Sequence, residues 1–288
     1  LNMVEYNGET VEQLADTVAK LTAQLDEDIA NNTGVIGYQV TSDLASINRI
    51  YAMRKKAVGL LGNTKGAQKP LAFAEDTAVP PEKLADFISE FRELLDSHDL
   101  HYGMFGHVDA GVLHVRPALD MCDPDQEKLL RVLSDKVVKL TAKYGGLMWG
   151  EHGKGYRSEY GPEFFGESLF TELRRLKTVF DPYNQMNPGK ICTPIESSEA
   201  LVSVDDEKRG MFDRQIPIEV KTSFKAPMEC NGNGLCFNYD ANSPMCPSSK
   251  ITRDRRHSPK GRAGLMREWL RLVEAKGVDI LSVEQQIN

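Results

Sequence analysis

Two glycine-rich stretches of the chain carry the side chains best suited to chemistry. Residues 103–117 read G-M-F-G-H-V-D-A-G-V-L-H-V-R-P, and residues 150–155 read G-E-H-G-K-G. Together they hold three of the six histidines of the chain, His107, His114 and His152, and one glutamate. Imidazole and carboxylate groups bind catalytic metals and accept protons. We therefore expect any active site to be built from these two stretches.

The spacing of His107 and His114 is compatible with a metal site. If Ala110-Gly111 forms a two-residue hairpin loop, the two histidines lie directly opposite each other, with Cβ atoms about 4.5–5.5 Å apart. Such a pair can share one divalent metal, and Glu151 on its glycine-flanked loop could complete a His2Glu set. His152 would then be a free base beside the metal. The alternative is that these are surface histidines of a hairpin or hydrogen-bonded core residues, since the spacing alone is not specific.

Alternating helices and strands are expected to position these stretches. The 3.6-residue period of apolar side chains predicts helices over residues 10–30, 43–60, 80–94, 123–143 and 163–180. Short apolar runs predict strands over residues 1–7, 34–40, 70–74, 101–108, 112–117 and 147–149. The order predicts an α+β fold, a mostly antiparallel sheet with helices on one face.

Bulk composition fits a globular protein of one large or two small domains. The chain has 288 residues, of which 41% are hydrophobic and 27% charged, with a net charge of -7. The acidic balance argues against nucleic acid as a partner. With no long apolar run and no leader, we expect no transmembrane segment and a cytoplasmic location, at most peripheral at the inner face of the membrane. Because the chain opens on Leu1 in a strand-like run, we expect a fragment of a longer protein.

Composition changes towards the end of the chain. Residues 196–210 are rich in Ser, Glu and Asp, and the following part is rich in Cys, Asn, Gly, Pro and Arg. We expect a first domain over residues 1–195, a linker over residues 196–225 and a small irregular or helical cysteine module over residues 226–288. Only residues 265–276 predict a clear helix in that module.

Three cysteines of this module indicate a metal cofactor. Cys230 and Cys236 flank N-G-N-G-L, and Cys246 follows ten positions later, directly before a proline. Closely spaced thiolates of this kind suit an iron–sulphur cluster, 4Fe-4S with one further ligand or a three-iron cluster. The main alternative is a structural zinc ion bound by the three cysteines and His257. Unligated thiols are a third possibility.

A basic segment follows the cysteines. Residues 250–271 contain eight lysines and arginines, which taken alone suggest nucleic acid. Few aromatic residues lie nearby to stack on bases, and the rest of the chain is acidic. Compensation of the charge of a cluster, or a solvated face, explains the segment better.

Three motifs in order connect the chain to a known family. G-H-V-D-A-G-V-L-H, G-E-H-G-K-G and D-P-Y-N-Q-M-N-P-G-K closely resemble the C-terminal substrate domain of FAD-linked 2-hydroxy-acid dehydrogenases, flavoproteins of the vanillyl-alcohol-oxidase type. The resemblance covers residues 1 to about 194 and implies a ferredoxin-like cap domain. It is strongest to the large bacterial members that oxidise D-2-hydroxyglutarate, which add an iron–sulphur region to the flavin and substrate domains.

The resemblance implies roles for individual residues. In the members that oxidise D-2-hydroxyglutarate, the two hairpin histidines and the glutamate bind a divalent metal, usually zinc, which here implies His107, His114 and Glu151. His152 matches the base that acts on the substrate hydroxyl. FAD would be bound mainly by a domain absent from this chain, because no glycine-rich nucleotide loop precedes residue 62.

Four further residues follow from the same resemblance. Arg54 and Lys69 match a helical arginine and a later lysine that hold substrate carboxylates, with a solvated helix face and loop as the alternative. Arg116 stands where the family has asparagine, and a cation there would favour a second carboxylate. Asn187 begins the N-P-G-K turn, which in the family packs back toward the flavin domain and would contact the cofactor, with a plain turn as the alternative. Asn233 stands where ferredoxin-like sites have their second cysteine, and D-A-G-V replaces the usual G-D-G-N of the hairpin.

These observations predict a dehydrogenase. Oxidation of a D-2-hydroxy acid, with D-2-hydroxyglutarate giving 2-oxoglutarate as the first choice, would send electrons through FAD and a cluster to an unidentified acceptor. The fragment alone would be inactive. Two other classes stay open from the residues alone: a zinc hydrolase using the His/His/Glu set, and a non-catalytic electron-transfer or docking module.

Overall fold

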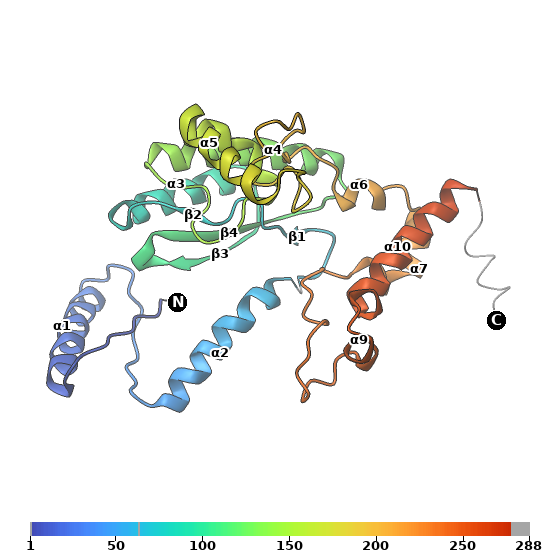
Figure 1. Cartoon of the computed structure of the whole chain (residues 1–288). Coiled ribbons are helices and arrows are strands. Elements are labelled where there is room, and N and C mark those ends of the chain that lie inside the picture. Colours follow the sequence, from blue (N-terminus) through green and yellow to red (C-terminus); the bar gives the residue numbers. More distant parts are fainter. Residues whose placement is uncertain (1, 63, 278–288) are drawn as a thin grey trace. The chain divides into compact units, whose positions relative to one another are not determined.

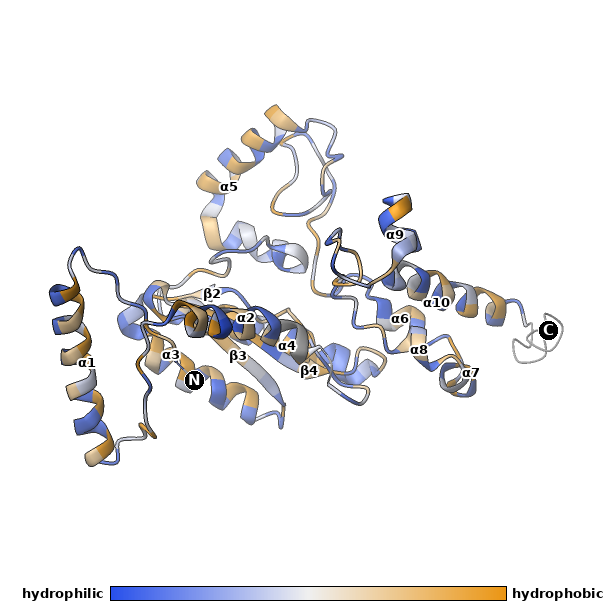
Figure 2. Cartoon of the chain, turned by 90° about the horizontal axis from the view of Figure 1, so that it is seen from below, coloured by the Kyte–Doolittle hydropathy of each residue, from blue (hydrophilic) through white to orange (hydrophobic). Residues whose placement is uncertain are grey.

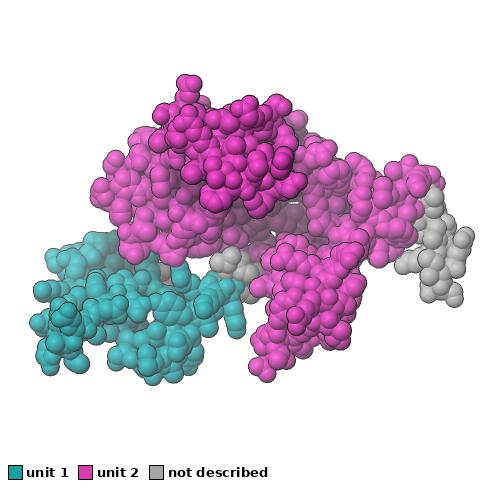
Figure 3. All heavy atoms as spheres, viewed as in Figure 1, with its two compact units in different colours: residues 1–57 teal, residues 58–288 magenta. Residues whose placement is uncertain are grey.

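The computed structural model describes residues 2–62 and 64–277, without the side chains of residues 58–60 (Figure 1). The chain divides into two compact units, residues 1–57 and 58–288 (Figure 3). No helix in the described part of the chain is both long and apolar enough to cross a membrane.

The first unit contains the first two predicted helices. Helix α1 spans Val11–Ala30, and the hydroxyl of Thr10 caps it by accepting from the amide of Gln13 at 3.2 Å. Helix α2 spans Leu44–Leu61 and runs into the second unit. The strands expected over residues 1–7 and 34–40 are wrong for the described residues, which form no strand. Residue 1 lies outside the described residues. Apolar alternation predicts a face to bury, but a strand also needs a partner for its backbone groups.

The second unit is built on a small antiparallel sheet. Strands β3 (Tyr102–His107) and β4 (Val112–Leu119) form the predicted hairpin, and β4 also pairs with β1 (Lys69–Pro70) and β2 (Thr77–Ala78). The strand expected over residues 70–74 is wrong beyond Pro70, because the chain turns at residues 72–74 before it enters β2. The strand expected over residues 147–149 is a single bridge from Leu147 to Ala78.

Helices cover one face of this sheet, as predicted (Figure 1). Helix α3 (Leu84–Asp96) follows a 3-10 turn, η1 (Pro81–Lys83), and helix α4 (Pro124–Lys143) begins after its cap at Asp123. Their apolar faces meet one side of β4 in a core that includes Phe87, Phe91, Leu95, Leu113, Val115, Leu119, Leu133 and Val137. Because side chains alternate along a strand, His114 and Arg116 lie on the other side of β4. The α+β prediction is confirmed.

Helix α5 is the next helix of the second unit. It spans Gly161–Phe180 after a 3-10 turn, η3 (Gly155–Tyr160), and it is kinked at Gly166, whose φ is 69°. The loop that follows α5 is hydrogen-bonded to this helix. The guanidinium of Arg174 donates to the carbonyls of Thr193, Pro194 and Ile195 at 3.1, 2.7 and 2.8 Å.

Short helices make up the last part of the described chain. They are α6 (Arg209–Asp213), α7 (Ile218–Ser223), α8 (Lys225–Met228), α9 (Pro247–Thr252), the 3-10 turn η4 (Arg255–His257) and α10 (Pro259–Ala275). Their small core contains Ile216, Val220 and Leu270, and hydrophilic and hydrophobic residues are mixed along α9 and α10 (Figure 2). The predicted helix of residues 265–276 begins earlier, at Pro259, where the hydroxyl of Ser258 accepts from the amide of Gly261 at 3.2 Å. The domain boundaries expected at residues 195 and 225 stay a prediction.

Candidate metal and active site

The hairpin brings His107 and His114 to the same face, but not directly opposite each other. His107 pairs with Val112, and Phe105 pairs with His114. The two-residue loop is wrong, because the turn has four residues: a 3-10 turn, η2 (Val108–Ala110), and Gly111 with φ 66°. A register shift of two residues preserves the face of each side chain. The two imidazole rings therefore still meet edge to face, with centroids 5.7 Å apart.

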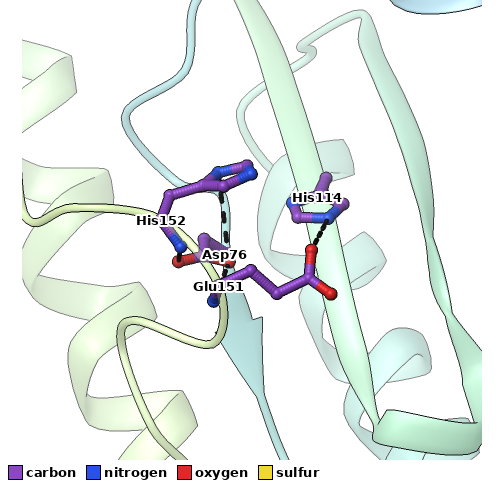
Figure 4. A group of neighbouring side chains, drawn as sticks. All are labelled: Asp76, His114, Glu151 and His152. Atoms are coloured by element: carbon purple, nitrogen blue, oxygen red, sulfur yellow. Dashed lines mark hydrogen bonds and ion pairs between the residues drawn. The ribbon is translucent and has the colours of Figure 1, made fainter. Parts of the chain in front are cut away.

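Glu151 lies between the two histidines. Its Oε2 is 3.5 Å from Nε2 of His107 and 3.5 Å from Nε2 of His114. His114 is buried, and Figure 4 shows its ring facing the carboxylate of Glu151. Burial is the main cause that lowers the pKa of His114, with the charge of His152 second. The ring is therefore neutral at pH 7, which is the form that binds metals.

Asp76 holds the loop that carries Glu151 and His152. Its side chain is fully buried, and its two carboxylate oxygens accept from the backbone amides of Glu151 and His152, each at 2.8 Å (Figure 4). The amide of Gly150 donates to the carbonyl of Asp76, also at 2.8 Å. Sequence reasoning missed Asp76. The signal was the acidic pair inside the apolar run F-A-E-D-T-A-V, where a buried carboxylate needs donors.

His152 stands next to the metal-ligand candidates. Its ring stacks on that of His114, with centroids 4.9 Å apart and planes inclined by 18°. Its Nδ1 is 3.5 Å from a carboxylate oxygen of Glu75. The same glutamate is buried, and its Oε2 accepts from Nε of Arg116 and pairs with Nη2, each at 3.0 Å. Arg116 thus lies at the edge of the site, and part of its charge is already balanced by Glu75.

Lys69 and Asn187 make their hydrogen bonds outside this cluster. Arg54 belongs to the first unit. The amine of Lys69 donates to the carbonyl of Thr64, within its own loop. Asn187 begins the turn that ends with the amide of Lys190 donating to its carbonyl at 3.1 Å, and it lines a pocket beside α5. The roles of these residues stay predictions.

Two separations between candidate ligand atoms have the length expected around a divalent metal. Ligand atoms about 2.0–2.2 Å from a tetrahedral zinc ion lie about 3.4 Å from one another. The 3.5 Å separations of Glu151 from both imidazoles match this spacing and exceed the usual length of a hydrogen bond. Among the described residues, the set whose ligand atoms all lie within 4.8 Å of one another is Asp76, His114, Glu151 and His152, and it does not include His107. We favour His107, His114 and Glu151, because Asp76 already accepts two backbone hydrogen bonds.

Replacing Asp76 tests its role in holding the loop. In Asp76→Asn, an amide NH2 faces one of the two backbone donors, so the loop loses one hydrogen bond and its charge assistance. We expect metal affinity to fall about 10–100-fold, as for other residues that orient metal ligands. Metal titration of the purified protein measures this. Asp86→Asn, at an exposed position of α3, removes the same charge and should bind metal like the wild type. Equal metal affinity in both variants would show that Asp76 does not hold the loop for metal binding.

The three cysteines of the C-terminal module are partly exposed free thiols. Cys236 accepts from the amide of Lys260 at 3.3 Å. The pKa of Cys246 is lowered to about 7, first by its hydrogen bonds to Ser248 and Ser249. Within residues 2–62 and 64–277, these thiols and His257 do not gather at the spacing that one metal ion requires. The iron–sulphur cluster, the structural zinc ion and unligated thiols all stay predictions.

Sequence comparison agrees with the fold and the site. The family described as FAD linked oxidases, C-terminal domain, matches residues 1–191, and the chain belongs to this family of FAD-linked oxidoreductases. The chain is 66% identical to a D-2-hydroxyglutarate dehydrogenase of Escherichia coli (strain K12) and 63% identical to one of Pantoea ananatis (strain AJ13355), each over 288 residues. A D-lactate dehydrogenase of Anaerostipes hadrus is 30% identical over 192 residues, 66% of this chain and 38% of the relative.

The matches differ in how much of each protein they cover. The first two relatives align with 100% of this chain, but the chain spans only 28% of their length. The predicted resemblance is confirmed, and family membership favours an oxidoreductase over the hydrolase alternative.

Proposed function

We propose that this chain forms the substrate-binding domain and the start of the iron–sulphur region of a flavoprotein that oxidises D-2-hydroxyglutarate to 2-oxoglutarate. In this proposal residues 1–195 bind the substrate, residues 196–225 form the linker, and residues 226–288 form the cysteine module. FAD would be bound mainly by another part of the polypeptide. The observation that carries the proposal is the carboxylate of Glu151 at 3.5 Å from two imidazoles, with His152 stacked beside them.

The residues of this chain supply binding and proton transfer. A divalent metal held by His107, His114 and Glu151 would act as a Lewis acid that makes the substrate hydroxyl more acidic. FAD would supply the acceptor for the hydrogen on C2 and its electron pair. His152 takes the hydroxyl proton as general base. The proximity of its Nδ1 to Glu75 favours the tautomer protonated at Nδ1, which leaves Nε2 free to accept.

Cationic side chains would hold the two carboxylates of the substrate. Arg116 has five N–H donors and uses only part of them on Glu75, so it can still bind a carboxylate at the edge of the site. Arg54 and Lys69 are proposed to bind the substrate as well, on the strength of the family resemblance. A dicarboxylate should therefore be preferred over D-lactate and glycolate, which have only one carboxylate.

A substrate screen tests this function. The complete polypeptide with its FAD is assayed with D-2-hydroxyglutarate, D-lactate and glycolate and an artificial electron acceptor. We expect kcat/KM to be at least about 10-fold higher for D-2-hydroxyglutarate, since one charged hydrogen bond contributes about 1.5–3 kcal/mol. Absence of turnover with all three acids would overturn the proposal.

The cysteine module is proposed to hold an iron–sulphur cluster through Cys230, Cys236 and Cys246. Support comes from the low pKa of Cys246 and from the close spacing of the three cysteines in the sequence. A thiol with a pKa of about 7 is half thiolate at neutral pH, and the thiolate is the form that binds iron.

Cys246→Ser is expected to remove the cluster while leaving flavin reduction intact. Substrate should still bleach the FAD absorbance at the wild-type rate, but transfer to the physiological acceptor should fall at least about 10-fold. Iron analysis and electron paramagnetic resonance measure the cluster. Cys122→Ser, a partly buried thiol outside the module, is the control. A wild-type protein purified anaerobically without iron would contradict the proposal.

A further inference from the structure

One buried carboxylate contacts both the proposed base and a proposed substrate-binding cation. The side chain of Glu75 is only 10% exposed. Its Oε1 is 3.5 Å from Nδ1 of His152, and its Oε2 is 3.0 Å from both Nε and Nη2 of Arg116. The two oxygens of one side chain therefore face two residues that would act on different groups of the substrate, the hydroxyl and a carboxylate.

The backbone of Glu75 is held in place from two sides. Nη1 of the buried Arg157 donates to the carbonyl of Glu75 and, at 3.1 Å, to that of Met148, in the segment that leads to the loop of Glu151 and His152. The next residue, Asp76, accepts from two amides of the same loop. Glu75 is thus a fixed point against which other side chains of the site can be oriented.

Arg116 is oriented by this fixed point before any ligand arrives. Its guanidinium lies 5.7 Å from the ring centroid of Phe105, and its Nε and Nη2 are engaged by Glu75. An arginine side chain carries about 2 kcal/mol of rotamer entropy, and the contacts with Glu75 restrict it in advance. The remaining N–H groups of the guanidinium stay available for a carboxylate of the substrate.

His152 needs a partner that fixes which nitrogen faces the substrate. Its side chain is 46% exposed, and stacking on His114 sets the plane of the ring but not the position of its proton. A carboxylate only accepts, so Glu75 beside Nδ1 keeps the proton there. Oδ1 of Asp76 is farther away, at 4.0 Å, and already accepts from a backbone amide. The 3.5 Å contact is longer than a hydrogen bond, and catalytic contacts of this kind commonly shorten when the substrate binds.

We propose that Glu75 is a positioning residue that aligns the base His152 with the substrate-binding Arg116. The inference rests on the proposed function, because it requires both residues to act on one hydroxy acid. The substrate has to place its hydroxyl at Nε2 of His152 and a carboxylate at Arg116 at the same time. One side chain, acting through these two residues, sets the separation of the two groups and thereby favours a dicarboxylate of matching length.

Glu75→Gln separates this role from support of the fold. A carboxamide has one acceptor oxygen, which should stay with Arg116, since a guanidinium only donates. The amide NH2 then faces Nδ1 of His152, so the proton moves to Nε2 and the base is blocked. In the complete polypeptide with FAD and metal, the limiting rate of FAD reduction by D-2-hydroxyglutarate should fall at least about 100-fold.

Binding of the product should respond differently from the rate. The Kd of 2-oxoglutarate, measured by isothermal titration calorimetry, should stay within about 3-fold of the wild type or become lower, because Arg116 keeps its orientation and loses a neighbouring negative charge. Damage to the fold would instead weaken binding and slow reduction together. That combined loss, or a wild-type rate in Glu75→Gln, would overturn the inference.

Two further variants complete the comparison. Glu82→Gln, at an exposed position of η1, makes the same replacement outside the site and should change neither quantity. Glu75→Asp keeps both acceptor oxygens on a side chain one methylene shorter, so its rate should lie between those of the wild type and Glu75→Gln. If Glu75→Gln does not fold, Glu75→Asp is decisive: a rate at least about 3-fold below the wild type supports the inference, and an unchanged rate overturns it.

The proposed function and the role of Glu75 fail separately. If the substrate screen shows turnover of D-lactate or glycolate but not of D-2-hydroxyglutarate, the rates are compared with that acid. A loss in Glu75→Gln would then keep the positioning role and refute the proposed substrate. Oxidation of D-2-hydroxyglutarate at the same rate in the wild type and Glu75→Gln would keep the function and refute the positioning role.

Discussion

Glu151→Gln is expected to lower kcat/KM for D-2-hydroxyglutarate by at least about 10³-fold, a loss of about 4 kcal/mol in transition-state stabilisation. His107 and His114 are neutral ligands, so Glu151 is the one anion among the three proposed ligands of the dication. An amide of the same shape leaves the metal without that charge. Bound metal should fall in parallel, as measured by elemental analysis of the purified holoenzyme.

The fold should tolerate this change. The contacts of the Glu151 carboxylate to the two histidines are 3.5 Å long, and the loop is held by its backbone amides on Asp76. FAD content, and the thermal stability of the two proteins compared in their metal-free forms, should therefore match the wild type. Glu163→Gln, an exposed glutamate on α5, makes the same replacement outside the site and should keep full activity. A Glu151→Gln protein that retains its metal and its activity would contradict the assignment.

The second large effect is on stability and concerns Arg131. From α4, its guanidinium donates to both carboxylate oxygens of Glu159 at 2.9 Å, to Asp205 at 2.9 Å and to Ser203 at 3.0 Å. It also bonds to Asp135 at 3.2 Å. These contacts join α4 to η3 and to the loop before α6. They also raise the pKa of Arg131 through hydrogen bonds to Asp205 and Glu159, even though burial, the largest single influence, opposes the charge.

Arg131→Ala should lower the free energy of unfolding of this part by about 2–4 kcal/mol. The variant leaves the carboxylates of Glu159, Asp135 and Asp205 close together without a cation, which costs less than in a fully buried pair because Asp205 is exposed. The melting temperature should fall by roughly 5–15 °C for a domain of this size. Arg175→Ala breaks an exposed pair with Glu172 on α5 and should shift it by less than about 2 °C. Equal melting temperatures in the two variants would show that the contacts of Arg131 do not stabilise the folded protein.

Local patterns in the sequence predicted much of the fold. The apolar period and the caps at Thr10 and Asp123 are local, so the helices they start were predictable. The face shared by His107 and His114 was predictable as well, because it depends only on the parity of the register. The register itself was not, since it depends on a 3-10 turn closed by Gly111. A Cβ atom at this glycine would lie 1.8 Å from the carbonyl oxygen of Val79, a residue distant in the sequence.

The missing parts of the site are long-range contacts. Asp76 and Glu75 lie about 75 residues before the loop that they contact. The residues next to them in the sequence do not indicate that Glu151, His152 or Arg116 are their partners. The strands expected over residues 1–7 and 34–40 had the local pattern but no partner in the described residues.

Metal removal followed by a single flavin reduction tests the central claim most directly. The complete polypeptide is freed of divalent metal with a chelator, and D-2-hydroxyglutarate is added under anaerobic conditions while the FAD absorbance is followed. We predict that reduction slows at least about 100-fold without metal and recovers with about one equivalent of zinc or another divalent ion, since the Lewis acid is lost and regained. Flavin reduction at the same rate in the metal-free and metal-loaded protein would contradict a metal site at His107, His114 and Glu151.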